Sequence, residues 1–188
     1  FGLELSGAYG IIEVGLPCID AGERQRKAGS VGKVLAGYSL RILEPDRAGR
    51  GRILLKGPGM FDAYFSPWKR RAEIVLDEWF DTGDVGYLDD DGFLFIVGRE
   101  KNVINFSGMK VFPYEVEAVI NQHPAVRESL VCGEPHAIFG QLPIAKVVVE
   151  EKSVVAGVEK DLRRFCFERL AMFKVPVRFE IVAELKRT

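Results

Sequence analysis

Residues 79–117 read WFDTGDVGYLDDDGFLFIVGREKNVINFSGMKVFPYEVE, an unbroken run that contains an acidic turn, a hairpin, a lone arginine and a glycine loop. Asp84 lies in a Gly-Asp turn just after an apolar strand, and Arg99 follows Gly98 at the end of a second apolar strand, residues 93–97. A carboxylate accepts hydrogen bonds, whereas a guanidinium only donates them. At the ends of neighbouring strands, Asp84 and Arg99 are therefore predicted to bind the two hydroxyls of a ribose-like ligand.

Alternating apolar and polar residues before this run predict a β-rich region. Residues 39–43 and 52–56 alternate as strands bounded by glycine and proline. Residues 67–76 are predicted to form a helix, because Ser66 is a good helix cap and proline is favoured at the first helical position. We expect the basic residues 69–71 to lie on the solvated face of this helix.

After Gly98 the pattern changes to alternating strands and helices, which predicts a compact α+β unit. Residues 158–173 have apolar side chains at near-helical spacing, and Pro176 prevents the helix from continuing. We place the domain boundary at this change, with residues 1–98 in the first domain and residues 99–188 in the second. The remaining predicted elements are a hairpin turn at 89–92, a helix at 113–122 and strands at 128–132, 145–149 and 178–182.

The composition is that of a globular chain without a strong charge bias. The chain has 188 residues, of which 47% are hydrophobic and 28% charged, and its formal net charge is -1. This balance gives no electrostatic argument for binding to nucleic acid or to an anionic membrane surface. The longest wholly apolar run, residues 93–97, is far shorter than the about 20 residues that a membrane span needs, so we expect no transmembrane segment.

The cysteines and histidines do not form a pattern typical of metal binding. Cys18, Cys132 and Cys166 are odd in number and widely spaced, which argues against a disulfide framework or a zinc site and predicts reduced thiols in the cytoplasm. His123 is expected to end a helix, and His136 is assigned no catalytic role. The first residue is not methionine, so we expect the chain to be a piece of a longer protein.

Four segments of the sequence carry a family resemblance. They are AYGIIE at 8–13, GSVGK at 29–33 followed by GRILLKGPGM at 51–60, WFDTGD at 79–84 with the Gly-Arg pair at 98–99, and residues 104–117. In this order they resemble the adenylate-forming superfamily: acyl-CoA synthetases, firefly-luciferase-like enzymes and peptide-synthetase adenylation domains. The resemblance implies an α+β fold, in which the β-rich end of a large N-terminal domain, a distorted barrel, precedes a small mobile α+β C-terminal domain.

The resemblance assigns nucleotide-binding roles to the first domain. It implies that Tyr9, beside Gly10, offers a flat ring on which adenine stacks. It also implies that Asp84 and Arg99 hold the ribose, in agreement with the prediction made from the residues themselves. Glu13 is implied to be a catalytic residue that holds Mg²⁺ against the triphosphate oxygens, because carboxylate oxygens suit this cation.

The resemblance assigns three further roles around the second domain. Lys101 matches the hinge about which the family's C-terminal domain rotates between two half-reactions. Gly108, within residues 107–109, is implied to let the pantetheine arm of coenzyme A approach the backbone closely. Lys110 is implied to assist with phosphate. Ile12 departs from the family pattern, because it stands where a hydroxyl residue is usual and cannot bond a phosphate.

The resemblance implies that the parent protein is an AMP-forming acyl-CoA synthetase. Such an enzyme activates a carboxylic acid, here expected to be a fatty acid, with ATP and Mg²⁺ to acyl-AMP, and then passes the acyl group to coenzyme A. Residues 29–33 lack the spacing of a phosphate-binding loop, and residues 184–188 resemble only the start of the segment whose lysine stabilises charge on the reacting groups. We therefore expect the isolated chain to be inactive.

Three alternatives stay open at this point. The acyl group could be transferred to a carrier protein instead of coenzyme A, or the chain could be a non-catalytic nucleotide-binding module. The Asp-Thr-Gly at residues 81–83 also occurs in aspartic proteases, in which two such aspartates share a proton. A second copy of that motif is absent from the sequence, which weighs against the protease.

Overall fold

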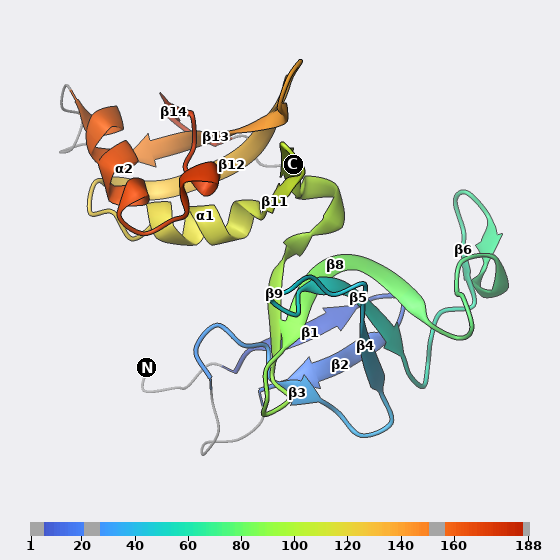
Figure 1. Ribbon diagram of the computed structural model, residues 1–188. Coiled ribbons are helices and arrows are strands. Elements are labelled where there is room, and N and C mark those ends of the chain that lie inside the picture. Colours follow the sequence, from blue (N-terminus) through green and yellow to red (C-terminus); the bar gives the residue numbers. More distant parts are fainter. Residues whose placement is uncertain (1–5, 21–26, 151–156, 186–188) are drawn as a thin grey trace. The chain divides into compact units, whose positions relative to one another are not determined.

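The structure, a computed structural model, describes residues 6–20, 27–150 and 157–185 (Figure 1). The chain divides into two compact units, Phe1–Glu100 (unit 1) and Lys101–Thr188 (unit 2). Unit 1 is built from strands, and unit 2 holds the two α-helices of the described residues together with a sheet. The predicted order, a β-rich part followed by an α+β part, is confirmed. Among the described residues, no helix is long and apolar enough to cross a membrane.

The strands of unit 1 pair antiparallel with one another. Within the described residues they form a three-stranded sheet of order β1-β2-β3, a four-stranded sheet of order β4-β5-β8-β9 and the separate hairpin β6-β7. The predicted turn between β8 and β9 is present, and Asp89 closes it by accepting hydrogen bonds from the backbone N–H groups of Asp91 and Phe93 at 3.0 and 2.9 Å. The strand bounds are β1 Ala8–Ile11, β2 Gly15–Ile19, β3 Lys33–Val34, β4 Ser39–Leu43, β5 Gly51–Lys56, β6 Ala63–Tyr64, β7 Lys69–Arg70, β8 Phe80–Leu88 and β9 Leu94–Arg99.

The core of unit 1 is formed by apolar residues of the four-stranded and the three-stranded sheet. Ile53 and Leu55 alternate along β5 and are fully buried, as is Leu94 at the start of β9. Tyr9 and Cys18 belong to the same hydrophobic cluster. The two larger sheets of unit 1 therefore share one core, and this core fixes where the ends of β8 and β9 lie.

The predicted helix at residues 67–76 is wrong. The segment contains strand β7, which pairs with β6, and only a single 3-10 turn, η1 (Arg71–Glu73). A helix of this length depends on packing its apolar face against the rest of the protein. Ile74 and Val75 pack against the core, whereas Trp68 and Leu76 are 66% and 77% exposed. The apolar residues of this segment thus do not share one buried face.

Unit 2 is a mixed sheet with helices packed on it. The strand order is β11-β10-β13-β12, and β14 pairs parallel with β13. β12 and β13 form a long hairpin, and each extends well beyond the strand predicted from sequence. The bounds are η2 Glu100–Asn102, β10 Ile104–Phe106, β11 Met109–Val111, α1 Pro113–Ile120, β12 Val126–His136, β13 Gly140–Val149, α2 Val158–Phe167, η4 Met172–Lys174 and β14 Arg178–Ile181.

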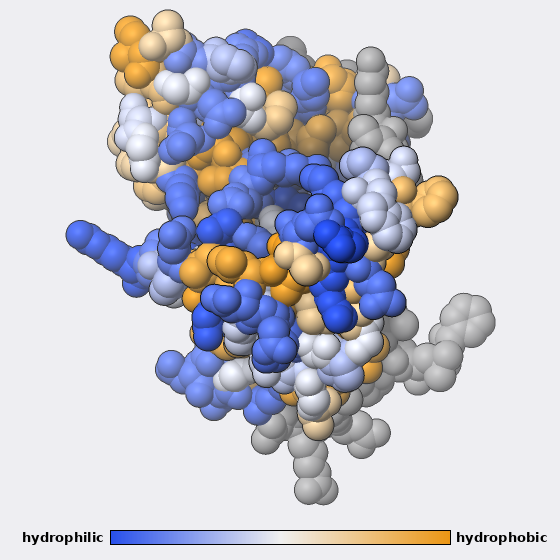
Figure 2. Space-filling model, turned by 90° about the vertical axis from the view of Figure 1, so that its right-hand side faces the viewer, coloured by the Kyte–Doolittle hydropathy of each residue, from blue (hydrophilic) through white to orange (hydrophobic). Residues whose placement is uncertain are grey.

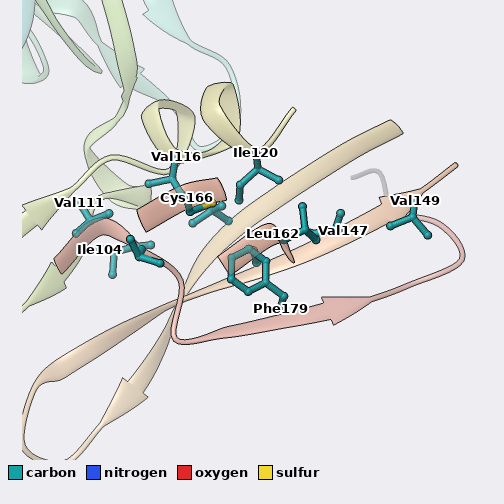
Figure 3. Packing of buried hydrophobic residues seen from close by; sticks show 12 residues of the cluster. Ile104, Val111, Val116, Ile120, Val147, Val149, Leu162, Cys166 and Phe179 are labelled. Carbon is teal, nitrogen blue, oxygen red and sulfur yellow. The ribbon is translucent and has the colours of Figure 1, made fainter. Parts of the chain in front are cut away.

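One hydrophobic core joins the sheet of unit 2 to both helices (Figure 3). Alternate residues of β13 point to the helices, and α1 and α2 each contribute a pair of buried residues spaced by four positions, which places them on one helix face. Helix α1 begins at Pro113 because proline suits the first helical position. The buried residues include Val147 and Val149 of β13, Val116 and Ile120 of α1, Leu162 and Cys166 of α2, and Phe179 of β14.

Helix α2 is shorter than predicted. It ends at Phe167, whereas the apolar spacing predicted a helix to residue 173. Leu170 and Phe173 do pack against the core, but from the irregular segment and from η4 rather than from the helix. The same segment brings Val175 into the core with 4% exposure. Apolar residues reach the core here by a change in chain direction, which helical spacing alone does not reveal.

Leu162→Ala is expected to lower the free energy of unfolding of unit 2 by about 3 kcal/mol, because a fully buried leucine leaves a cavity when truncated. Phe167→Ala on the same helix is the matched control, since Phe167 is 50% exposed. Urea unfolding followed by helical circular dichroism measures both, because the α-helices of the described residues lie in unit 2. Equal losses in the two variants would contradict the assigned core.

Candidate functional site

Asp84 and Arg99 lie directly opposite each other on β8 and β9. The Nε atom of Arg99 is 2.8 Å from Oδ1 of Asp84. The aspartate side chain is 7% exposed and the arginine side chain 54% exposed. The two residues singled out from the sequence are thus brought together as an ion pair, with the carboxylate inside and part of the guanidinium open to solvent.

A hydrogen-bond network holds Asp84 in place. The Tyr9 hydroxyl donates to Oδ2 of Asp84 at 2.6 Å, and Oδ1 faces Arg99 in the ion pair, so each carboxylate oxygen has one protein partner. The backbone N–H of Asp84 donates to Thr82 Oγ1 at 3.0 Å, and the Thr82 hydroxyl donates to the carbonyl of Ile53 at 2.9 Å. Burial and the bond to Asp84 raise the pKa of Tyr9 above its ordinary value. Tyr9 therefore stays a neutral donor that orients the carboxylate.

Tyr9 is 9% exposed, and its ring lies in the hydrophobic cluster of unit 1. The expected stacking of adenine on this ring stays a prediction. Next to it, Gly10 has no room for a side chain, because an added Cβ would lie 2.9 Å from the carbonyl oxygen of Gly15 and 3.0 Å from Leu16 Cδ1. Gly10 thus permits the close approach of β1 and β2. Ile12, in the turn between these strands, is 98% exposed.

Glu13 is tied to the β6–β7 hairpin. The Tyr64 hydroxyl donates to Glu13 Oε1 at 2.6 Å, and the backbone N–H of Phe61 donates to the Glu13 carbonyl at 2.9 Å. Within the described residues, no group of three or more His, Cys, Asp or Glu side chains could hold a metal ion by itself. Mg²⁺ is commonly bound by one or two carboxylates with phosphate oxygens and water. A single carboxylate at Glu13 fits that mode of binding.

The pKa of Tyr64 is expected to fall when Glu13 is replaced by glutamine. Burial first, and then the bond to Glu13, raise the pKa of Tyr64 from 10.0 to about 12. Because the neutral phenol is favoured in the folded state, its contribution to stability is complete below about pH 10 and is lost as the pH rises through about 12. Ultraviolet titration, with Tyr64→Phe to identify the band, measures this. Glu44→Gln is the control, and an unchanged pKa in Glu13→Gln would exclude the coupling.

The predicted residues of unit 2 are exposed. Lys101 is exposed in η2, and Lys110 is exposed on β11. Ser107 and Gly108 join β10 to β11 with φ values of 49° and 80°, and positive φ at both central positions is typical of a type I′ hairpin turn. No atom lies within 4 Å of a Cβ placed on Gly108, and the backbone N–H of Ser107 donates to the Phe139 carbonyl at 2.9 Å.

A cavity of about 300 Å³ in unit 1 is separate from these residues. It is lined by Lys56, Met60, Arg71, Val75 and Glu78, among others, and Lys56 forms an ion pair with Glu78. None of the residues predicted to bind nucleotide lines it.

The family described as AMP-binding enzyme C-terminal domain matches residues 115–188. Over 165 residues the chain is 41% identical to a 2-succinylbenzoate–CoA ligase of Geobacillus kaustophilus, a match that covers 86% of this chain and 33% of that protein. The chain belongs to the adenylate-forming superfamily. The chain spans about a third of the length of the curated relatives it matches.

Solved structures of adenylate-forming enzymes have the same fold. ATP-bound MatB from Rhodopseudomonas palustris matches with a TM-score of 0.88 at 34% identity, over 100% of this chain and 38% of that one. MenE from Bacillus subtilis, an o-succinylbenzoate CoA synthetase in complex with the acyl-adenylate OSB-AMP, matches with a TM-score of 0.84 at 34% identity, over 99% and 39%. The aspartic-protease alternative is therefore discarded. The aspartate of that motif, Asp81, is also engaged in an ion pair and does not share a proton with a second aspartate, because Arg52 Nη1 donates to Asp81 Oδ2 at 2.7 Å.

Reasoning from the sequence of this adenylate-forming chain missed two residues that make structural contacts. The first is Thr82, whose hydroxyl oxygen accepts a hydrogen bond from the backbone N–H of Asp84. A hydroxyl residue two positions before an aspartate is a signal that could have revealed this contact. The second is His123, which is 6% exposed and brings Nε2 within 3.2 Å of Asp161 Oδ2. Its Nδ1 accepts from the backbone N–H of Ala125, so Nε2 carries the hydrogen. His123 follows α1 and joins it to α2, which makes its role structural.

Proposed function

We propose that the chain is the nucleotide-binding and hinge portion of an AMP-forming acid–CoA ligase. The observation that carries this proposal is the buried Asp84 carboxylate, which is held by Tyr9 and Arg99. An ionised carboxylate has about four lone-pair sites, and the protein uses one on each oxygen. The remaining sites suit the two hydroxyls of an adenosine ribose, while the exposed part of Arg99 donates to the same sugar.

This arrangement favours binding because the charged acceptor is fixed before the ligand arrives. The Tyr9 hydroxyl, by a hydrogen bond of 2.6 Å, and the Arg99 guanidinium, by an ion pair of 2.8 Å, hold Asp84, so little side-chain freedom is lost when a ribose binds. Hydrogen bonds to a charged acceptor are also stronger than bonds between neutral groups. The network therefore supplies both affinity for a nucleoside and a fixed orientation of its phosphates.

Glu13 is the proposed protein ligand of Mg²⁺. Its carboxylate is anchored by Tyr64, which donates to Oε1 at 2.6 Å. When bound, Mg²⁺ neutralises charge on the phosphate oxygens of ATP. Ile12, beside Glu13, is apolar and gives the phosphates no hydroxyl donor. We therefore assign the cation to Glu13 and no phosphate contact to Ile12.

Unit 2 is proposed to receive the acceptor thiol. Lys101 would act as the hinge residue. The turn at Gly108 would lie along the pantetheine arm of coenzyme A, because the space around a Cβ placed on Gly108 is open. Lys110 would assist in binding phosphate. Coenzyme A is preferred over a carrier protein because relatives at 41% identity are named as CoA ligases.

The acid is proposed to be a small-molecule carboxylic acid. The expectation of a fatty acid gains no support from the relatives, since those named above include ligases of 2-succinylbenzoate. The location is proposed to be the cytoplasm, because Cys18, Cys132 and Cys166 are all free thiols. The expected lysine-bearing segment begins at residues 184–188, of which residues 186–188 lie outside the described residues.

The test compares the 188-residue chain with its parent enzyme. The parent should catalyse ATP–pyrophosphate exchange that depends on a carboxylic acid, and should form a thioester with coenzyme A. The chain alone should do neither. ATP–pyrophosphate exchange catalysed by the pure chain would contradict the expectation that the isolated chain is inactive. A parent that loads a phosphopantetheine carrier and ignores coenzyme A would overturn the assignment of the acceptor.

A further inference from the structure

A bulge interrupts strand β8 at residues 82–84, which end with Asp84. The register between β5 and β8 shifts at Ile53, so residues 82–84 stand opposite this single residue of β5. Gly83, in the middle of the bulge, has a left-handed φ of 68°. A bulge bends its strand and re-aims the side chains beside it, and bulges are frequent next to functional sites. The direction of the Asp84 side chain therefore depends on how this bulge is held.

The Thr82 hydroxyl holds the bulge by bonding to the backbone on both of its sides. It accepts a hydrogen bond from the backbone N–H of Asp84 at 3.0 Å, and it donates one to the carbonyl oxygen of Ile53 at 2.9 Å. In a regular antiparallel pair, N–H and C=O groups of neighbouring strands bond to each other directly. The hydroxyl is thus inserted between an N–H of β8 and a C=O of β5, as a spacer of the width that the bulge requires.

The contacts of Thr82 lie inside unit 1, because Thr82 and Asp84 are both buried. A buried backbone N–H or C=O that loses its partner is costly. Valine has nearly the shape of threonine but neither accepts nor donates, so it would leave both backbone groups without the hydroxyl that joins them. Figure 2 shows hydrophobic and hydrophilic residues side by side on one face of the molecule. The rest of the parent protein can cover such a surface, whereas contacts buried within unit 1 do not depend on it.

We propose that Thr82 is a positioning residue, which aims the Asp84 carboxylate at the two hydroxyls of the ribose. Tyr9 and Arg99 hold the oxygens of this carboxylate, and Thr82 fixes the backbone from which it projects. Because the Thr82 hydroxyl is engaged with backbone on both sides, it acts through Asp84 and not by contact with the nucleotide. This role rests on the proposed function, in which Asp84 binds the ribose.

The test compares AMP with 2′,3′-dideoxy-AMP, which lacks both ribose hydroxyls, by calorimetric titration of the parent enzyme. Thr82→Val should lower the affinity for AMP about tenfold and that for dideoxy-AMP less than about twofold, because only AMP offers hydroxyls to Asp84. Thr82→Ser keeps the hydroxyl and should bind AMP within about threefold of the unchanged enzyme. Thr82→Cys, with a thiol that is only a weak donor, should give a smaller loss in the same direction as Thr82→Val.

Ser30→Ala is the matched control. The Ser30 hydroxyl also accepts from a backbone N–H two positions on, that of Gly32 at 2.9 Å, but it lies in another loop of unit 1. Its loss should leave the preference for AMP over dideoxy-AMP unchanged, even if thermal unfolding shows a lower stability.

Two results would overturn the role of Thr82 alone. One is an unchanged affinity of Thr82→Val for AMP, and the other is an equal loss for AMP and dideoxy-AMP, which would make the hydroxyl important only for the fold. If Thr82→Val does not fold, the same two results in Thr82→Cys decide. An unchanged enzyme that binds AMP and dideoxy-AMP alike would instead overturn the proposed contact of Asp84 with the ribose, and the role of Thr82 with it.

Discussion

Asp84→Asn is expected to weaken the binding of AMP to the parent enzyme by about 10- to 100-fold, since a hydrogen bond to a charged group is worth about 1.5–3 kcal/mol. Asparagine keeps the shape of the side chain but replaces one carboxylate oxygen with a donor. That oxygen already faces either Tyr9 or Arg99, which are both donors. The substitution therefore removes the acceptor for the ribose and also disturbs the network that orients it. Calorimetric titration with AMP measures the loss.

Asp81→Asn is the matched control for Asp84→Asn. Asp81 lies on the same strand but is exposed and pairs with Arg52, so its loss should change AMP affinity less than about twofold, as expected for a surface ion pair. Thermal unfolding of both variants separates loss of binding from loss of fold. If Asp84→Asn binds AMP as the unchanged enzyme does, Asp84 does not bind the ribose. Tyr9→Phe should give an intermediate loss, because it removes the hydrogen bond to Asp84 and leaves the ion pair with Arg99.

Local patterns in the sequence were sufficient to predict the elements whose structure is decided by neighbouring residues. The strand at 39–43 and the turn at 89–92 were predicted correctly, because period-two alternation and an Asp-Gly pair act over a few residues. The pairing of Asp84 with Arg99 needs more than this turn. The hairpin closed at 89–92 pairs Gly86 with Ile96, a register that would place Asp84 opposite Gly98, and an irregularity between Val85 and Gly86 shifts the pairing by one residue so that Asp84 faces Arg99.

Contacts between distant parts of the chain could not be read in this way. Tyr9 and Asp84 are 75 positions apart, and the bond between them depends on the register of two different sheets. Sequence reasoning gave Tyr9 a role toward adenine but not toward the carboxylate. The helix expected at 67–76 failed for a related reason, since its cap signals were local, whereas the segment begins instead with β7, which pairs with the earlier strand β6.

Gly32→Ala is expected to destabilise unit 1 by more than about 4 kcal/mol, because it combines left-handed backbone strain with a steric clash. Gly32 has a φ of 90°, and an added Cβ would lie 2.1 Å from the carbonyl carbon and oxygen of Ile19 and 2.2 Å from the nitrogen of Asp20. These are backbone atoms, so no side-chain rotation can relieve the contact. The carbonyl of Gly32 also accepts from Leu94 N–H at 2.9 Å, so any shift of the loop disturbs the start of β9.

Gly29→Ala isolates the contribution of the clash. Gly29 has a similar φ of 82°, but nothing lies within 4 Å of its Cβ position. This variant should therefore lose only about 1–2 kcal/mol, the cost of a left-handed backbone without glycine. Urea unfolding followed by tryptophan fluorescence reports on unit 1, because Trp68 and Trp79 both belong to it. Equal losses in the two variants would show that Gly32 is required for its φ alone, and that the contact between this loop and the end of β2 yields without cost.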